Sequence, residues 1–268
     1  MRKAICFILI ISVIFLLCGC MPFGVTEPAP RETTAPETHS MSTEESATDG
    51  TTVSTEPPHT QLYIPGVSME DMIRYFNEVA LSIEYNNGPG DPNLIQKWKY
   101  PIYYHIEGDP TDQDIAILLG LFDELNAIYG FPGIYPADYR SQANLKISFL
   151  DRENFRLNFS DYINGEEADG AVQFWYYTDT NEIYEAEIGY RTDISQEIRN
   201  SVLLEEIINA LGLSDSALRS DSIVYQYGSS ATALSREDWV IIQLLYHPDM
   251  ACGMDADACK LVIEKIYN

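Results

Sequence analysis

The segment "LLEEIINALGLSDS", residues 203–216, decides how the chain is interpreted, because it places two adjacent glutamates inside an apolar, helix-forming run. At about 100° per residue, apolar side chains cover almost every direction around this helix, and Glu205, Asn209 and Glu206 share one narrow window near 0, 40 and 100°. A helix that is apolar nearly all round is central in its domain. Carboxylates at the edge of a core need a hydrogen-bond donor, a cation, a metal ion or a proton.

The window has two interpretations at this stage. In the structural one, Glu205 and Glu206 cap a neighbouring loop or form ion pairs with Arg199 or Arg219. In the functional interpretation, the two glutamates take part in binding a ligand or a metal ion, or in catalysis.

Helix starts are predicted by a hydroxyl or aspartate cap with an acid or amide three residues later. The pairs are Ser68 with Asp71, Thr111 with Asp114, Asp193 with Gln196, and Ser235 with Asp238. The third pair opens the glutamate helix, which we expect to end at Gly212. A last helix is expected over residues 256–266.

Four segments have the composition and length of strands. They are residues 100–106, 144–150, 171–178 and 183–191, and the turn "DTNE" between the last two predicts a hairpin. The order of elements predicts an α/β (α+β) fold in one domain, with a mixed twisted sheet of about four strands, the glutamate helix at its centre and further helices at the C-terminal end.

The N-terminal region predicts the compartment. Residues 1–19 have a basic start and a short apolar run, as a secretory signal has, and the sequence Leu-Cys-Gly before Cys20 resembles the bacterial lipobox. We therefore expect lipidation at Cys20 and a place on the extracytoplasmic face of the cell membrane, with an uncleaved anchor as the alternative. Residues 20–61, rich in Thr, Glu, Pro and Ser, predict a disordered tether before a domain at 62–268.

The net charge limits the expected binding partners, and the cysteines allow one disulfide. The chain has 41 acidic and 16 basic residues, and without Arg2 and Lys3 its net charge is near −27. Nucleic acid is not an expected partner, because binding it requires a basic face. Outside the cell a disulfide between Cys252 and Cys259 can persist, and two free thiols are the alternative.

The glutamate helix resembles the metal-binding helix of metzincin (zincin-type) metallopeptidases, H-E-x-x-H-x-x-G-x-x-H, in which three imidazoles hold zinc and the glutamate is the general base. The resemblance puts the base at Glu206 and the turn glycine at Gly212. The three ligand positions fall on Glu205, Asn209 and Asp215.

Other segments extend the resemblance over most of the domain. The run "ALSREDWVIIQLLYHP", residues 233–248, is similar to the helix after the Met-turn of matrix-type metzincins, although Val224 stands where the methionine of that turn should be. The E-E, L-G-L, L-S and L-Y pattern is similar to the bacterial family called domain of unknown function 2927, which implies a lipoprotein with a zincin-like fold.

The departures from the motif determine the expected chemistry. Zinc in such sites requires imidazole or thiolate, and none of the four histidines, His39, His59, His105 and His247, falls at a ligand position. We therefore expect no cofactor and, in particular, no zinc. The oxygen atoms of Glu205, Glu206 and Asp215 would suit calcium, magnesium or manganese better.

Three functions follow as expectations. The first is a lipid-anchored, catalytically inactive module that binds a peptide or protein, with the hairpin at 171–190 offering an edge strand to an extended ligand. The second is a metal-dependent, peptidase-like hydrolase in which Glu206 acts as general base on a metal-bound water. The third is a structural envelope protein without a ligand.

Overall fold

The computed structural model describes residues 62–81, 93–159, 168–226, 228 and 230–267. The predicted signal at 1–19, the tether at 20–61 and the lipidation site Cys20 lie outside the described residues. None of the helices in the described ranges is long and apolar enough to span a bilayer.

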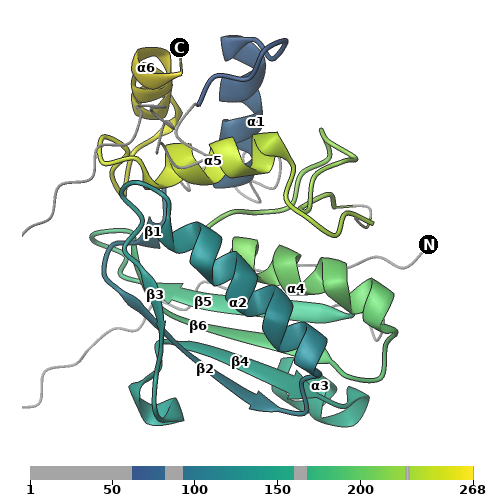
Figure 1. Ribbon diagram of the computed structural model, residues 1–268. Coiled ribbons are helices and arrows are strands. Elements are labelled where there is room, and N and C mark those ends of the chain that lie inside the picture. The colour runs from purple at the N-terminus through teal and green to yellow at the C-terminus, as the bar shows by residue number, and fades with distance from the viewer. Residues whose placement is uncertain (1–61, 82–92, 160–167, 227, 229, 268) are drawn as a thin grey trace, which may run out of the picture. The chain divides into compact units, whose positions relative to one another are not determined.

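The described strands form one mixed sheet (Figure 1). They are β1 (Lys97–Trp98), β2 (Ile102–Gly108), β3 (Ile134–Pro136), β4 (Leu145–Leu150), β5 (Gly170–Tyr176) and β6 (Glu182–Arg191). Their order is β1-β6-β4-β2-β3, with β5 paired to β6. All pairings are parallel except β5 with β6, which is antiparallel and confirms the predicted hairpin.

The sheet has six strands, so the expectation of about four was wrong. The two strands that the sequence did not predict, β1 and β3, are only 2 and 3 residues long. Segments this short are below the length at which alternation of apolar and polar residues becomes a signal. They form because β2 and β6 offer them a partner edge.

The described helices are α1 (Met69–Leu81), α2 (Asp112–Asn126), α3 (Arg152–Phe159), α4 (Gln196–Ala210), α5 (Arg236–Tyr246) and α6 (Ala256–Ile266), with one 3-10 turn, η2 (Arg140–Gln142). The capping boxes predicted for α2 and α5 are both present, and α6 has the predicted bounds. Helix α3 was not predicted.

The predicted cap of α4 was wrong by two residues. The N-cap is Ser195, whose hydroxyl accepts the N–H of Ile198. Asp193 instead binds the guanidinium of Arg191 at 2.9 and 2.7 Å. The charged partner at the end of β6 draws the aspartate away from the helix, and a serine caps equally well.

Helices α2 and α4 cover one face of the sheet, and α1, α5 and α6 form a separate group beyond α4 (Figure 1). Side chains such as Ile147, Ile188 and Leu203 meet in the core between the sheet and α4. Helix α3 packs on the other face, where Phe155 and Phe159 form a small second cluster.

Candidate functional site

Helix α4 carries its glutamates inside the core, as the sequence predicts. Every residue from 201 to 210 is buried. Glu205, Glu206 and Asn209 are 3%, 2% and 0% exposed. Neither glutamate therefore lies in bulk water.

The chain after α4 turns back toward the helix at Gly212. The φ angle of this residue is +100°, and a Cβ at this position would lie 2.1 Å from the backbone oxygen of Gln96, so only glycine fits. Ser214 then donates its N–H to Val79 O of α1 at 2.8 Å. Asp215, 8% exposed, receives the Nδ2–H of Asn209 at 3.1 Å. The turn thus brings two of the three predicted ligand positions into contact.

The segment beyond Asp215 is fixed by backbone pairing and by an acid from α1. Ser216 and Tyr225 form a parallel bridge, in which Ser216 donates to Val224 O at 2.8 Å. Glu78 accepts both the hydroxyl of Ser216 and the N–H of Ala217, each at 2.8 Å. Val224, which the sequence resemblance compares with the Met-turn methionine, takes part in this pairing through its carbonyl and is 2% exposed.

The two arginines considered as partners for the glutamates bind elsewhere. Arg199 forms a buried ion pair with Asp114 of α2, Nε to Oδ1, at 2.9 Å. Arg219 pairs with Asp221 at 2.6 Å and with Glu237 at 2.9 Å. That structural explanation of the polar window was therefore wrong.

The acids at the end of α4, Glu205, Glu206 and Asp215, are called the acidic cluster below. In the described part of the chain, none of them forms an ion pair with a Lys, Arg or His side chain. Two acceptor atoms of the site, Glu206 Oε2 and Asn209 Oδ1, are buried without a hydrogen-bond partner. Unpartnered buried acceptors are uncommon in native proteins and carry a desolvation cost of roughly 1–3 kcal/mol each.

Burial and mutual repulsion shift the protonation of the acidic cluster. Burial first, then the carboxylates of Asp215 and Glu206, hold the pKa of Glu205 well above its usual range. The pKa of Glu206 is raised by burial and by Asp215 in the same way. Burial raises the pKa of Asp215 to about 6, against the opposing hydrogen bond from Asn209.

Strand β5 forms the wall beside the cluster. A Cβ on Gly170 would lie 2.9 Å from both Cγ and Oε1 of Glu206, so the carboxylate packs directly on the backbone of this strand. The preceding residue, Asp169, is 6% exposed, lies 3.4 Å from Arg191 and adds to the repulsion on Glu205. The sequence did not predict Asp169, because no pattern links it to the distant helix.

The donors at the three predicted ligand positions do not fit zinc. They offer carboxylate and amide oxygens, whereas a zinc site of this type is built from imidazole nitrogen or thiolate. The two histidines that the structure describes lie in β2 and at the C-cap of α5. Over the described ranges, no three His, Cys, Asp or Glu side chains are grouped so as to hold a metal ion.

Cys252 and Cys259 are free thiols in the structure, so the predicted disulfide is not formed there. Cys252 donates to Lys97 O at 3.7 Å, and the buried Cys259 lies in the first turn of α6. Lys97 itself is buried and donates to Leu245 O at 2.7 Å and to Met250 O, at the C-terminal end of α5. Burial lowers the pKa of this lysine to about 8.

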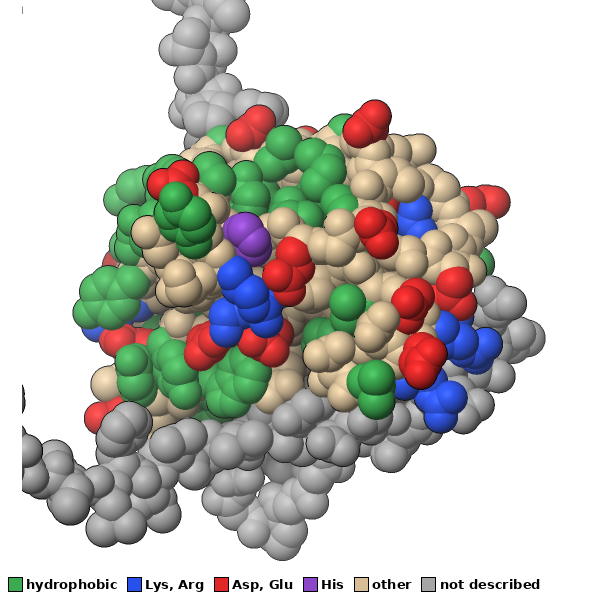
Figure 2. All heavy atoms as spheres, turned by 90° about the horizontal axis from the view of Figure 1, so that it is seen from below, with side chains coloured by type: hydrophobic (Ala, Val, Ile, Leu, Met, Phe, Trp, Pro, Cys, Tyr) green, Lys and Arg blue, Asp and Glu red, His purple; other side chains and the backbone are tan. Residues whose placement is uncertain are grey.

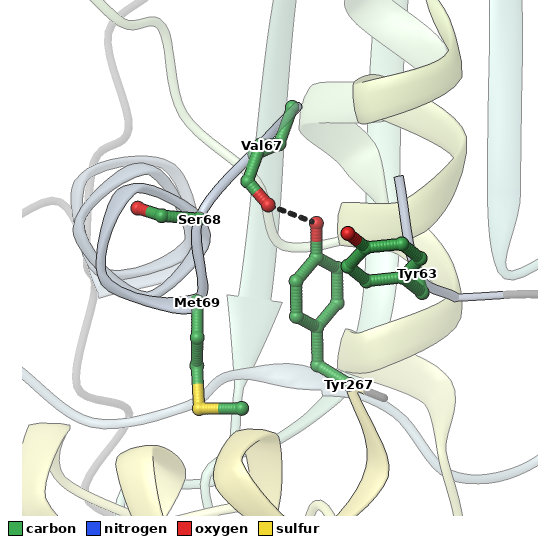
Figure 3. Close-up of a pocket in the computed structure, with 5 residues that line it drawn as sticks. All are labelled: Tyr63, Val67, Ser68, Met69 and Tyr267. Carbon is green, nitrogen blue, oxygen red and sulfur yellow. Dashed lines mark hydrogen bonds between the residues drawn. The ribbon is translucent and has the colours of Figure 1, made fainter. Parts of the chain in front are cut away.

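A hollow of about 380 Å³ lies away from the acidic cluster, where the described chain begins (Figure 3). The rings of Tyr63 and Tyr267 face it, with the side chain of Met69 and the N-terminus of α1 opposite. The hydroxyl of Tyr267 donates to Val67 O at 3.3 Å. This contact ties the C-terminal end of the chain to the start of α1, which is a structural role.

A family model described as "Protein of unknown function (DUF2927)" matches residues 69–265. This range includes all described helices and strands except the last residue of α6, and it covers the acidic cluster, Gly212 and Val224. The chain therefore belongs to this family. No curated protein matches it.

Proposed function

We propose that this member of the DUF2927 family is a lipid-anchored, extracytoplasmic module with a metzincin-like fold that binds a peptide or protein and does not hydrolyse it. The order from β2 to α4 supports the resemblance to metzincins: a strand, a helix, two strands, the short helix α3, the β5–β6 hairpin and the buried motif helix. The lipid anchor and the membrane location rest on the predicted signal and on Cys20.

The observation that carries the non-catalytic proposal is the hydrogen bond between Asn209 and Asp215. It engages two of the three former ligand positions with each other. The third position, Glu205, is a buried carboxyl whose pKa is raised. A set of one amide and raised-pKa carboxyls is a poor replacement for three neutral imidazoles.

Strand β5 supports the binding part of the proposal. Among the described strands it pairs only with β6, so its other edge is available for β-augmentation. Residues 171–174 are buried, while Trp175 and Tyr176 are half-buried, so a ligand would engage this end of the strand. The N–H of Tyr177 bonds Glu182 O on β6, so the ladder with β6 extends to this end of the strand.

The proposal is tested with a fluorescent peptide library and the full chain. Tyr176→Pro disturbs the extended backbone at this end of β5 and should weaken peptide binding about tenfold, because strand addition requires a regular edge. Tyr176→Phe keeps the N–H and serves as the matched control. Equal binding by the two variants, or no binding by the wild type, would contradict the proposal.

An alternative function is a peptidase-like hydrolase with Glu206 as general base. The unpartnered Glu206 Oε2 and Asn209 Oδ1 favour it, because a hard cation such as calcium, magnesium or manganese would satisfy both oxygens. Such an ion would supply the positive charge that the acidic cluster lacks.

Metal analysis separates the two functions. Stoichiometric metal in the purified chain, with a melting temperature lowered by chelator, would overturn the non-catalytic proposal. Peptide hydrolysis that is abolished in Glu206→Gln would establish the alternative. We expect neither result.

A further inference from the structure

The sheet face opposite α4, called the outer face below, has its own side-chain pattern. Alternation along the strands directs Ile147 and Ile188 into the core, so their neighbours Lys146 and Glu187 lie on the outer face. Helix α3 covers only one end of this face, where the ring of Phe159 packs on the backbone of β6. From below, a histidine and basic side chains are ringed by acidic ones, with hydrophobic side chains to either side (Figure 2).

Three aromatic side chains, called the aromatic row, share one register row across the outer face. Tyr103 on β2 pairs in register with Tyr135 on β3, and their ring centroids are 6.3 Å apart. The register through β4 and β6 places Trp175 of β5 on the same row, opposite Glu185. Three strand spacings, about 14 Å, separate Tyr103 from Trp175. Both tyrosines are nearly half exposed, at 45% and 47%.

The basic side chains beside the aromatic row are already paired. Lys146 contacts Glu185 at 2.5 Å and Glu187 at 3.0 Å. Arg140 contacts Glu107 at 2.5 Å. Among its described residues the outer face therefore presents paired hydrogen-bonding groups beside the aromatic row, which disfavours an anionic polymer as its ligand.

Exposed aliphatic side chains lie elsewhere in the described structure. The exposed leucines are Leu119 on α2, Leu157 on α3, Leu218 in the loop after α4 and Leu261 on α6. On the sheet strands, the large exposed apolar side chains are Tyr103 and Tyr135. On the described strands the exposed apolar surface of this face is therefore aromatic, and an exposed leucine occurs only on α3, at the covered end.

The combination of flat rings and fixed polar groups suits a neutral sugar chain. The C–H faces of pyranose rings pack on aromatic faces, while the sugar hydroxyls both donate and accept hydrogen bonds. Glu185, Glu187 and Lys146 supply acceptors and a donor beside the row. We propose that the outer face binds a neutral oligosaccharide or polysaccharide chain through the aromatic row. This site is on the opposite face from the acidic cluster. It shares Trp175 with the strand end of the proposed function, but Tyr103 and Tyr135, which the test changes, lie on other strands.

The test uses the full chain purified in detergent, with chitohexaose, cellohexaose and maltohexaose as probes in calorimetric titrations. At least one probe should bind the wild type, and the double variant Tyr103→Ala/Tyr135→Ala should bind it about tenfold more weakly, because ring stacking is lost. Tyr103→Phe/Tyr135→Phe keeps both rings and should retain most of the binding.

A matched control is Tyr129→Ala, which removes a 75% exposed tyrosine that lies beside His247, away from the sheet. This variant should bind as the wild type does. If the double alanine variant does not fold, Tyr135→Ala on the short edge strand β3 gives the same test with less disturbance.

Three results would overturn the proposal. The first is the absence of binding by all three sugars at millimolar concentration. The second is unchanged binding in the alanine variants. The third is binding of heparin or of a peptide library, in place of the neutral sugars, that the double alanine variant loses.

Discussion

Both ends of helix α4 bury charged side chains, but they differ in how these charges are compensated. At the N-terminal end, Arg199 is 5% exposed and pairs with the fully buried Asp114, and Gln196 donates to the same carboxylate at 2.6 Å. At the C-terminal end, Glu205 and Glu206 lie beside Asp215 with no cation from the described residues.

This difference distinguishes a structural ion-pair network at the N-terminal end of α4 from a candidate functional site at its C-terminal end. The Asp114 network joins α2 to α4 and includes the capping box of α2, so each charge has a structural purpose. Among the described residues, the acidic cluster joins no second element through an ion pair, and Glu206 Oε2 and the neighbouring Asn209 Oδ1 have no hydrogen-bond partner. Buried charge without a structural partner is more often kept for function than for stability.

The largest expected effect is at the paired end. Asp114→Ala leaves the guanidinium of Arg199 buried without its carboxylate, so the free energy of unfolding should fall by about 3–5 kcal/mol. Urea denaturation measures the change. Arg199→Met in the same chain should recover a large part of the loss, because the uncompensated charge is removed. A loss below about 1 kcal/mol in the single variant would show that the pair is not structural.

Opposite pH dependences should distinguish the two ends. The pKa of Asp215 is raised to about 6, so its ionisation opposes folding. Its contribution should therefore decrease stability by about 2 kcal/mol as the pH rises from about 4 through 6. Urea midpoints measured between these pH values give the profile, and Asp215→Asn should flatten it.

The pKa of Asp114 moves the other way. Burial alone would raise it, but the hydrogen bonds from Arg199, Gln196 and Thr111 together lower it. Its stabilisation is present above the unfolded pKa and is lost as the pH falls through the lower folded value. A cation bound in the acidic cluster would favour the ionised form of Asp215 and reverse its pH dependence. A free energy of unfolding that rises from pH 4 to 6 would therefore contradict the prediction for Asp215.

A smaller effect is expected at the unpaired end. Glu206→Gln keeps the shape of the side chain but removes a buried negative charge that the described cations do not compensate. We expect the free energy of unfolding at pH 8 to rise by about 1–2 kcal/mol. Glu197→Gln, an exposed change on the same helix, is the control and should have almost no effect. Destabilisation by Glu206→Gln would mean that the carboxylate has a partner.

The smallest effect concerns the start of α4. Ser195→Ala removes the hydroxyl that accepts the N–H of Ile198 and should lower the free energy of unfolding by about 1 kcal/mol. Asp193→Ala breaks a half-exposed ion pair with Arg191 and should cost less. A larger loss for Asp193→Ala than for Ser195→Ala would show that Asp193 is the cap of α4.

The local patterns in the sequence were sufficient for most of the elements. The caps of α2 and α5 were predicted because a side chain three residues away is fixed by the helix itself. The hairpin of β5 and β6 was predicted from its turn, where Asn181 has a φ of +57°. Strands β1 and β3 were missed because two or three residues are too few for an alternating pattern.

The sequence alone determined that α4 is apolar nearly all round, that Glu205, Glu206 and Asn209 share one side of it, and that a glycine ends the turn after it. These properties follow from the helical period and from backbone geometry, which are local. Only the tertiary structure decided which charges meet. In the folded chain Arg199 pairs with Asp114, and Arg219 pairs with Asp221 and Glu237. Ion pairs depend on distances between elements, and the spacing of residues along the sequence does not determine these distances. For the same reason, the acidic cluster has no ion pair with a cation of the described residues.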